Sequence, residues 1–233
     1  MAPNPWFAVW NYEFMQAVFH YLPHAPATDD FFQYLISNPL VSTWIPAAFF
    51  YVFWAKQDEQ QAFRRRWLLN VLVAFTFAVL ITLIVRPWIA WPAPLLNPAF
   101  QPLYPRYLWG TGSRNCFPSH STLAYFTIAA GFWPLNRSVS VGLSALMLAV
   151  VSLPRLYVGG HYPIDVLFSC VLGVLVLVVV WRWPIPDAIS SWLIESPARA
   201  SLRDCVFFLW VFELGEGFRG MEFLLEAARR LAH

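Results

Sequence analysis

The feature that most constrains this chain is a series of apolar segments that carry no charge. Trp67–Val85 is uncharged over 19 residues, and about 20 apolar residues are enough to cross the hydrocarbon core of a bilayer. The chain is 59% hydrophobic and only 12% charged, whereas about 25% of the residues of a soluble protein are charged. We therefore predict an all-α, polytopic membrane helix bundle with five or six transmembrane helices. Shorter uncharged runs that add to this prediction are Leu40–Ala55, Ser121–Trp133, Ser138–Leu153 and Val166–Trp181.

The remaining composition excludes several classes of protein. A net charge of +2 is too small to indicate binding of nucleic acid. The three cysteines are far apart and odd in number, which favours small buried apolar residues over disulfides or metal ligands. No basic segment precedes an apolar core at the N-terminus, so we expect no cleavable signal peptide. The expected partners are the membrane and a small substrate, and the sequence does not indicate an oligomeric state.

Charges and prolines divide the chain into three parts. Residues 1–38 contain no uncharged window long enough to span a bilayer, and we expect interfacial helices or one tilted span there. Residues 39–183 hold the apolar runs and form the predicted transmembrane core. Residues 184–233 mix apolar and charged positions, which predicts amphipathic helices of a cytoplasmic tail or, alternatively, of a partner interface.

Basic residues beside apolar runs predict the orientation in the membrane, because they remain on the cytoplasmic side. Arg64–Arg66, Arg137 and Arg182 stand at alternate ends of the predicted helices. The other helix ends, which this alternation places on the outer face, carry a second set of polar residues. These are Arg86, Ser119, His120, Arg155, His161 and Asp165.

The stretch from Arg155 to Asp165 contains the most informative residues of that set. Pro163 suits the first position of a helix, so Asp165 would lie in the first turn, where the helix dipole favours a carboxylate. A carboxylate that orients an imidazole is a common way to activate a histidine, here His161. The fork-shaped guanidinium of Arg155 suits a phosphate. On these residues alone, a helix cap beside an arginine at the lipid headgroups explains the pattern equally well.

Together these residues resemble the type 2 phosphatidic acid phosphatase family, the lipid-phosphatase branch of the superfamily that includes vanadium haloperoxidases. The resemblance covers about Leu40 to Trp181. The family's third motif is Ser-Arg, five residues, His, three residues, Asp, and here Pro154 replaces the serine before Arg155, His161 and Asp165. The second motif, Pro-Ser-any-His, is close to Pro118-Ser119-His120. The first motif, Lys, six residues, Arg-Pro, ends here in Arg86-Pro87.

Two positions depart from the family's motifs. Val79 stands where the first motif has its lysine, and Arg114 or Arg106 from the long loop at residues 87–118 could supply the missing cation. In the second motif the histidine comes one residue early, so an ungapped match puts Ser121 at its position. One residue turns a helix by about 100°. We favour His120, because a one-residue deletion before the helix begins would absorb the shift.

The resemblance implies a reaction and roles for these residues. His161 would be the nucleophile that forms a phosphohistidine, Asp165 would orient it, and His120 would protonate the leaving group. The implied phosphate ligands are Arg86, Ser119 and Arg155, with Arg114 as the substitute cation. We expect no cofactor and no metal, because the sequence has no acidic cluster of the kind that binds magnesium.

The expected substrate is a lipid phosphate or diphosphate, such as undecaprenyl diphosphate, phosphatidic acid, phosphatidylglycerol phosphate or lipid A phosphate. The expected location is the bacterial inner (plasma) membrane, with the active site facing the periplasm or the outside. Two alternatives are a lipid phosphotransferase that uses the same site and a catalytically weak member of the family that binds phospholipid or acts as a scaffold.

Overall fold

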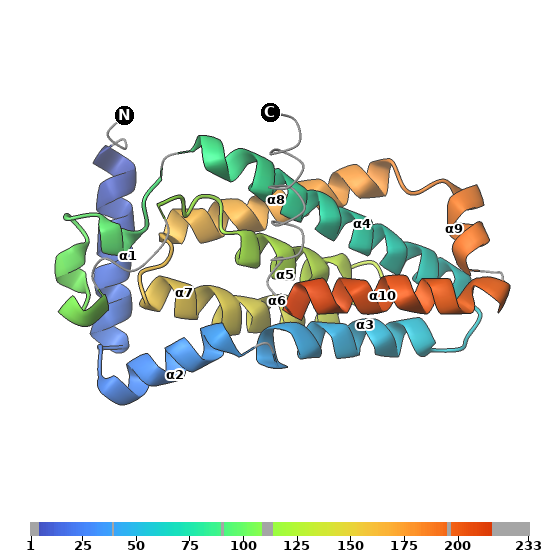
Figure 1. Ribbon diagram of the computed structural model, residues 1–233, viewed down its shortest axis with the longest axis horizontal. Coiled ribbons are helices and arrows are strands. Elements are labelled where there is room, and N and C mark those ends of the chain that lie inside the picture. Colours follow the sequence, from blue (N-terminus) through green and yellow to red (C-terminus); the bar gives the residue numbers. More distant parts are fainter. Residues whose placement is uncertain (1–4, 39, 90, 109–113, 195–196, 216–233) are drawn as a thin grey trace, which may run out of the picture.

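The protein is described here by a computed structural model, which covers residues 5–38, 40–89, 91–108, 114–194 and 197–215. Within these ranges every regular element is a helix, which confirms the all-α prediction. The longer helices lie side by side in an elongated bundle (Figure 1). The α-helices are α1 (Pro5–Tyr21), α2 (Pro26–Ser37), α3 (Ile45–Ala55), α4 (Gln61–Val85), α5 (His120–Gly131), α6 (Arg137–Met147), α7 (Leu153–Tyr157), α8 (Pro163–Arg182), α9 (Asp187–Ile194) and α10 (Ala200–Gly215).

Short helical turns complete these elements. The π-helical turn η6 (Leu148–Ser152) joins α6 to α7, so that Arg137–Tyr157 forms one continuous span. The loop after α4 is built from single turns, which are η2 (Arg86–Trp88), η3 (Pro94–Leu96), η4 (Gln101–Leu103) and η5 (Arg106–Leu108).

Helix α5 lies at the centre of the bundle and packs against α4, α6 and α8. Nine of its twelve residues are buried, among them Leu123, Ile128 and Ala129. At its C-terminal end the Trp67 indole donates a 2.7 Å hydrogen bond to the Gly131 carbonyl. The main apolar core therefore lies around α5, between its two neighbours in the chain and the later helix α8.

Three helices are long and apolar enough to cross a membrane: Gln61–Trp88, Arg137–Tyr157 and Pro163–Arg182. A fourth span results if Pro26–Ser37 and Ser42–Ala55, bent by 45°, are counted as one. The described residues therefore fit a membrane protein with three or four spans, and the predicted count of five or six is not confirmed. Helix α5 accounts for part of the difference, because at 12 residues it extends about 18 Å and is enclosed by other helices.

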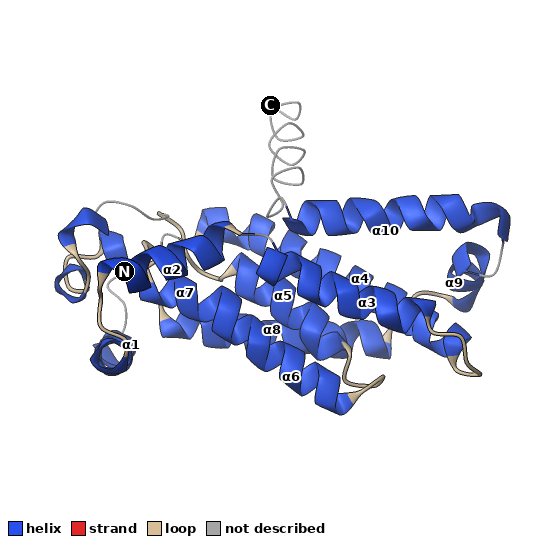
Figure 2. Cartoon of the chain, turned by 90° about the horizontal axis from the view of Figure 1, so that it is seen from below, coloured by secondary structure: helices blue, strands red, loops and turns tan. Residues whose placement is uncertain are grey.

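Helix α1 crosses one end of the bundle and is seen end-on in Figure 2. The Asn11 side chain accepts a 3.1 Å hydrogen bond from the backbone N–H of Ile164, so α1 contacts the first turn of α8. This orientation favours the interfacial alternative for residues 1–38, which stays a prediction.

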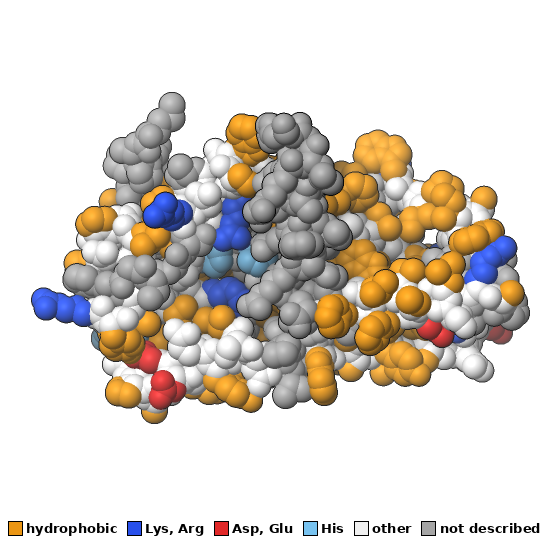
Figure 3. All heavy atoms as spheres, viewed as in Figure 1, with side chains coloured by type: hydrophobic (Ala, Val, Ile, Leu, Met, Phe, Trp, Pro, Cys, Tyr) orange, Lys and Arg blue, Asp and Glu red, His pale blue; other side chains and the backbone are white. Residues whose placement is uncertain are grey.

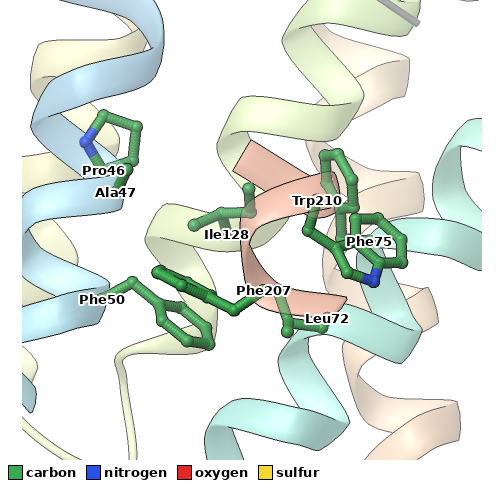
Figure 4. A pocket seen from close by; sticks show the side chains of 8 residues that line it. All are labelled: Pro46, Ala47, Phe50, Leu72, Phe75, Ile128, Phe207 and Trp210. Carbon is green, nitrogen blue, oxygen red and sulfur yellow. The ribbon is translucent and has the colours of Figure 1, made fainter. Parts of the chain in front are cut away.

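Helix α10 runs back along the bundle from α9 (Figures 1 and 2). Figure 4 shows its side chains meeting those of α3, α4 and α5. The rings of Phe207 and Phe50 stack at 5.1 Å, and Trp210 meets Phe75 edge-on at 4.9 Å. The described part of the predicted tail thus packs on the bundle. Residues 216–233 lie outside the described residues, and the cytoplasmic location stays a prediction.

The ends of the helices define the two ends of the bundle. Helix α4 begins where α8 ends, since the rings of Trp67 and Trp181 meet edge-on at 6.4 Å. At the same end Arg66 forms a 3.1 Å ion pair with Asp187 of α9. The antiparallel course of the chain then brings the end of α4, the start of α5 and the turn between α7 and α8 to the opposite end, where the site lies.

Candidate active site

The turn between α7 and α8 holds Arg155 and His161 close together. The Arg155 carbonyl accepts hydrogen bonds from the backbone N–H groups of Gly160 at 2.8 Å and His161 at 3.3 Å. The chain can reverse here because Gly159 has φ +73°, a conformation that favours glycine. A Cβ at Gly159 would lie 2.7 Å from Leu95 and 2.9 Å from Tyr104.

Asp165 is fixed beside His161 in the first turn of α8. Its Oδ2 accepts hydrogen bonds from the Tyr162 backbone N–H at 2.8 Å and from the Cys116 thiol at 3.2 Å. The same oxygen lies 3.5 Å from His161 Nδ1. Asp165 is 0% exposed and His161 is 7% exposed. With Nδ1 beside the carboxylate, the other ring nitrogen, Nε2, is on the far edge of the imidazole.

Two arginines surround the second histidine. Arg86, directly after α4, donates through Nε to the Asn115 carbonyl, and its Nη1 lies 3.4 Å from His120 Nδ1. Arg155 donates to the Val151 carbonyl at 2.8 Å. Both guanidinium groups and His161 lie within electrostatic range of His120. Figure 3 shows two histidine side chains in a hollow of the surface, with Lys or Arg side chains on either side.

The structure distinguishes His120 from Ser121 by their surroundings. His120 is the first residue of α5 and faces Arg86, whereas Ser121 is buried and its hydroxyl lies 3.3 Å from His120 Nε2. His120 therefore lies beside a cation of the candidate site. The preferred alignment and the role of His120 as the acid both stay predictions.

Ser119 precedes α5, but its hydroxyl makes no capping hydrogen bond. Instead it donates to Thr122 Oγ1 at 3.0 Å, and that oxygen lies 2.9 Å from Ser152 Oγ. All three side chains are buried. They connect α5 to η6, and phosphate binding by Ser119 stays a prediction.

Val79, which stands where the first motif has its lysine, lies in the apolar core. Val79 is 1% exposed and packs among core residues, on the same side of α4 as Arg86, because seven residues make nearly two helical turns. Arg114 and Arg106 are both exposed on the loop after α4. Arg114 immediately precedes Asn115, whose carbonyl accepts from Arg86.

A polar cluster around Asp29 ties this loop to the bundle. Asp29 of α2 accepts hydrogen bonds from Tyr157 of α7 at 2.7 Å and from Tyr107 of η5, and its other polar neighbour is His24 at 2.8 Å. The hydrogen bond to Asp29 raises the pKa of Tyr107 to about 12. Arg155 is two residues before Tyr157 in α7, so the cluster anchors the helix that carries Arg155.

Sequence reasoning missed the contact of Cys116 with Asp165. Cys116 is 0% exposed, and its backbone N–H donates to the Trp91 carbonyl at 2.8 Å. Burial and the negative charge of Asp165 raise the pKa of the thiol. No motif or spacing pointed to this residue, because it approaches Asp165 only through the fold of the loop. The neighbouring Gly110–Gly112 turn lies outside the described residues.

Comparison with known proteins gives one match. A sequence model of the PAP2 superfamily matches residues 67–187, which extend from α4 to the first residue of α9. The match includes the two histidines, Asp165, Cys116 and the two arginines beside His120, whereas Asp29 and His24 lie before it. No curated protein and no solved structure matches the chain.

Proposed function

The chain belongs to the PAP2 superfamily, and we propose that it is an integral membrane phosphatase that hydrolyses a lipid phosphate or diphosphate through a phosphohistidine. Membership supports a phosphatase-type function. The observation that carries the finer proposal is the buried His161–Asp165 pair, 3.5 Å apart, beside His120 and two arginines.

In the first step His161 Nε2 attacks the phosphorus atom, and the bond from phosphorus to the leaving oxygen breaks. The attacking nitrogen needs its lone pair, so the ring proton must be on Nδ1, the nitrogen beside Asp165. The carboxylate stabilises the positive charge that the ring acquires. Asp165 can hold this position because the Tyr162 N–H and the Cys116 thiol already fix its Oδ2.

His120 supplies the proton for the leaving oxygen. A guanidinium has no acceptor, so its contact with His120 Nδ1 requires a neutral imidazole with its proton on Nε2. A phosphate bound beside Arg86 adds negative charge, which favours the protonated imidazole. In the second step the neutral ring removes a proton from water, which attacks the phosphohistidine and releases phosphate.

Arg86 and Arg155 stabilise the charge that develops on the phosphoryl oxygens. Phosphoryl transfer depends mainly on positioning and electrostatic stabilisation of these oxygens. Two permanent cations within range of His120 meet this need. Arg114, exposed on the loop, is proposed to approach the phosphate and to replace the lysine absent at position 79.

The proposed substrate is a membrane lipid, because the site lies at the end of a bundle whose helices are apolar enough to span a bilayer. We place the site at the outer or periplasmic face of a bacterial inner membrane, since the arginines at Arg64–Arg66 and Arg182 mark the other end as cytoplasmic. Candidate lipids are undecaprenyl diphosphate, phosphatidic acid and phosphatidylglycerol phosphate.

The test is phosphate release by the purified protein in detergent, with these three lipids as a panel. Its matched variants are His120→Ala and Ser121→Ala, which alter adjacent residues. Truncation of His120 should lower turnover by about 100-fold or more, as expected for loss of a general acid. Truncation of Ser121 should have a much smaller effect.

Retained turnover in His120→Ala would remove this residue from the acid role. No release from any lipid, with vanadate still bound, would contradict a phosphatase and favour a protein that binds phospholipid without hydrolysing it. Transfer of phosphate to a second lipid in place of water would identify a phosphotransferase.

A further inference from the structure

We propose that Cys116, His161 and Asp165 form a binding site for Zn²⁺, and that occupation of this site inhibits the enzyme. The inhibition rests on the proposed function, whereas binding of the ion does not. The three residues offer a thiol, an imidazole and a carboxylate, and their ligand atoms all lie within 4.8 Å of one another. Zinc in proteins takes this mixture of sulfur, nitrogen and oxygen donors.

The distances are close to those of a zinc site. Cys116 Sγ lies 3.2 Å and His161 Nδ1 lies 3.5 Å from Asp165 Oδ2. Zinc–ligand bonds of about 2.0–2.3 Å in a tetrahedron place the ligand atoms roughly 3.3–3.6 Å apart. Small side-chain movements would therefore suffice, and the fourth position would be left for water or a phosphate oxygen.

Two polar atoms of the proposed zinc ligands lack a hydrogen-bond partner among the described residues. His161 Nδ1 and Asp165 Oδ1 are buried and make no hydrogen bond. Buried polar atoms are nearly always paired, and an unpaired one can indicate an ion. Cys116 and Asp165 are each held by a backbone hydrogen bond, from Cys116 N–H to Trp91 and from Tyr162 N–H to Asp165, so the donors are preorganised. His161 is 7% exposed, so the three residues reach the surface through this side chain.

Zinc at this position would prevent the first step of the reaction. Ligands bind the ion without their protons, so the thiol releases its proton to solvent and Nδ1 of His161 must present its lone pair. The neutral imidazole then carries its proton on Nε2, the nitrogen that would attack phosphorus. The ion would also occupy the oxygen of Asp165 that stabilises the charged ring.

The donor set also predicts selectivity. A thiolate and an imidazole favour zinc, whereas magnesium and calcium prefer oxygen ligands. Magnesium at the same concentration should therefore leave turnover unchanged. The two other cysteines, Cys170 and Cys205, are free and belong to α8 and α10, and they provide matched controls.

Binding is tested with Co²⁺ as a spectroscopic substitute for zinc, added to the detergent-purified full chain. The wild-type protein and the Cys170→Ser/Cys205→Ser variant should show a thiolate-to-cobalt charge-transfer band at one equivalent, and zinc should displace it. Cys116→Ala should lack the band, and Cys116→Ser provides a second variant of nearly unchanged size. Helical circular dichroism and thermal unfolding in detergent check that each variant is folded. A band that persists without Cys116, or no band in the wild type, would overturn the site.

Inhibition is measured as phosphate release with and without Zn²⁺ within each protein. Zinc should inhibit the wild type reversibly, a chelator should restore turnover, and Cys116→Ala should raise the half-inhibitory concentration at least about tenfold, or 1.4 kcal/mol. Equal sensitivity of the two proteins would overturn the proposal. A cobalt band without any turnover would contradict the proposed function alone, whereas turnover without a band would contradict the zinc site alone.

Discussion

At the scale of single residues, Asp165 connects most parts of the site. Its Oδ2 accepts hydrogen bonds from the Tyr162 N–H and the Cys116 thiol, and it lies 3.5 Å from His161 Nδ1. The spacing of His161 and Asp165 in the sequence predicted their pairing, because His161 lies two residues before α8 and Asp165 lies in the first turn of that helix. The contact with Cys116 could not be predicted, since it depends on how a loop without repeating pattern folds back over α8.

The missing lysine leads to a prediction at this scale. Arg114→Ala should raise KM for the lipid phosphate roughly tenfold, which corresponds to the loss of one hydrogen bond to a charged group. The reason is that Arg114 precedes Asn115, whose carbonyl accepts a hydrogen bond from Arg86. Arg106→Ala is the matched control, as Arg106 is exposed on the same loop but at η5. Steady-state kinetics of both variants decide the question, and equal, negligible effects would show that neither arginine replaces the lysine.

At the scale of elements, the turn from α7 to α8 determines the distance between Arg155 and His161. The predicted start of α8 at Pro163 agrees with the structure, because proline at a helix start has a clear physical reason. The transmembrane span predicted from the uncharged run that contains α5 is not confirmed. Composition shows that such a run is apolar, but it does not distinguish a helix surrounded by lipid from one surrounded by other helices.

The geometry of this turn gives a second prediction. Gly159→Ala should destabilise the protein by about 2 kcal/mol or more, since the left-handed backbone costs about 1–2 kcal/mol for alanine and the new Cβ would contact Leu95 at 2.7 Å. Turnover should fall with it, because His161 moves. Gly142→Ala in α6 is the matched control, with no atom within 4 Å of the added Cβ, and should gain about 0.5–1 kcal/mol. Thermal unfolding in detergent measures both, and similar melting temperatures would contradict this account of the turn.

At the scale of the whole molecule, the alternation of charges predicted which helix ends lie together at one end of the bundle. Their side of the membrane stays a prediction, and the predicted number of spans is not confirmed. Arg86 and His120 meet because α4 and α5 run in opposite directions. The arrangement of α1 across the bundle end and of α10 along α3 depends on long-range packing, such as the stacking of Phe207 on Phe50, which local sequence does not encode.

The proposed orientation can be tested by labelling with a membrane-impermeant maleimide. In a Cys170→Ser/Cys205→Ser background, whose remaining Cys116 is buried, Ala99→Cys should be labelled in intact spheroplasts. Glu59→Cys should be labelled only after permeabilisation, since it lies in the loop before α4 at the opposite end. Both positions are exposed. The reverse pattern would place the site on the cytoplasmic side.

The central claim is that His161 becomes phosphorylated during turnover. The most direct measurement mixes the protein with undecaprenyl diphosphate carrying a radioactive terminal phosphate, quenches the mixture in alkali, and locates the label by mass spectrometry. The account predicts base-stable, acid-labile phosphate on His161 in the wild type, and neither label nor turnover in His161→Ala. Label on another residue, or turnover that persists in His161→Ala, would contradict it.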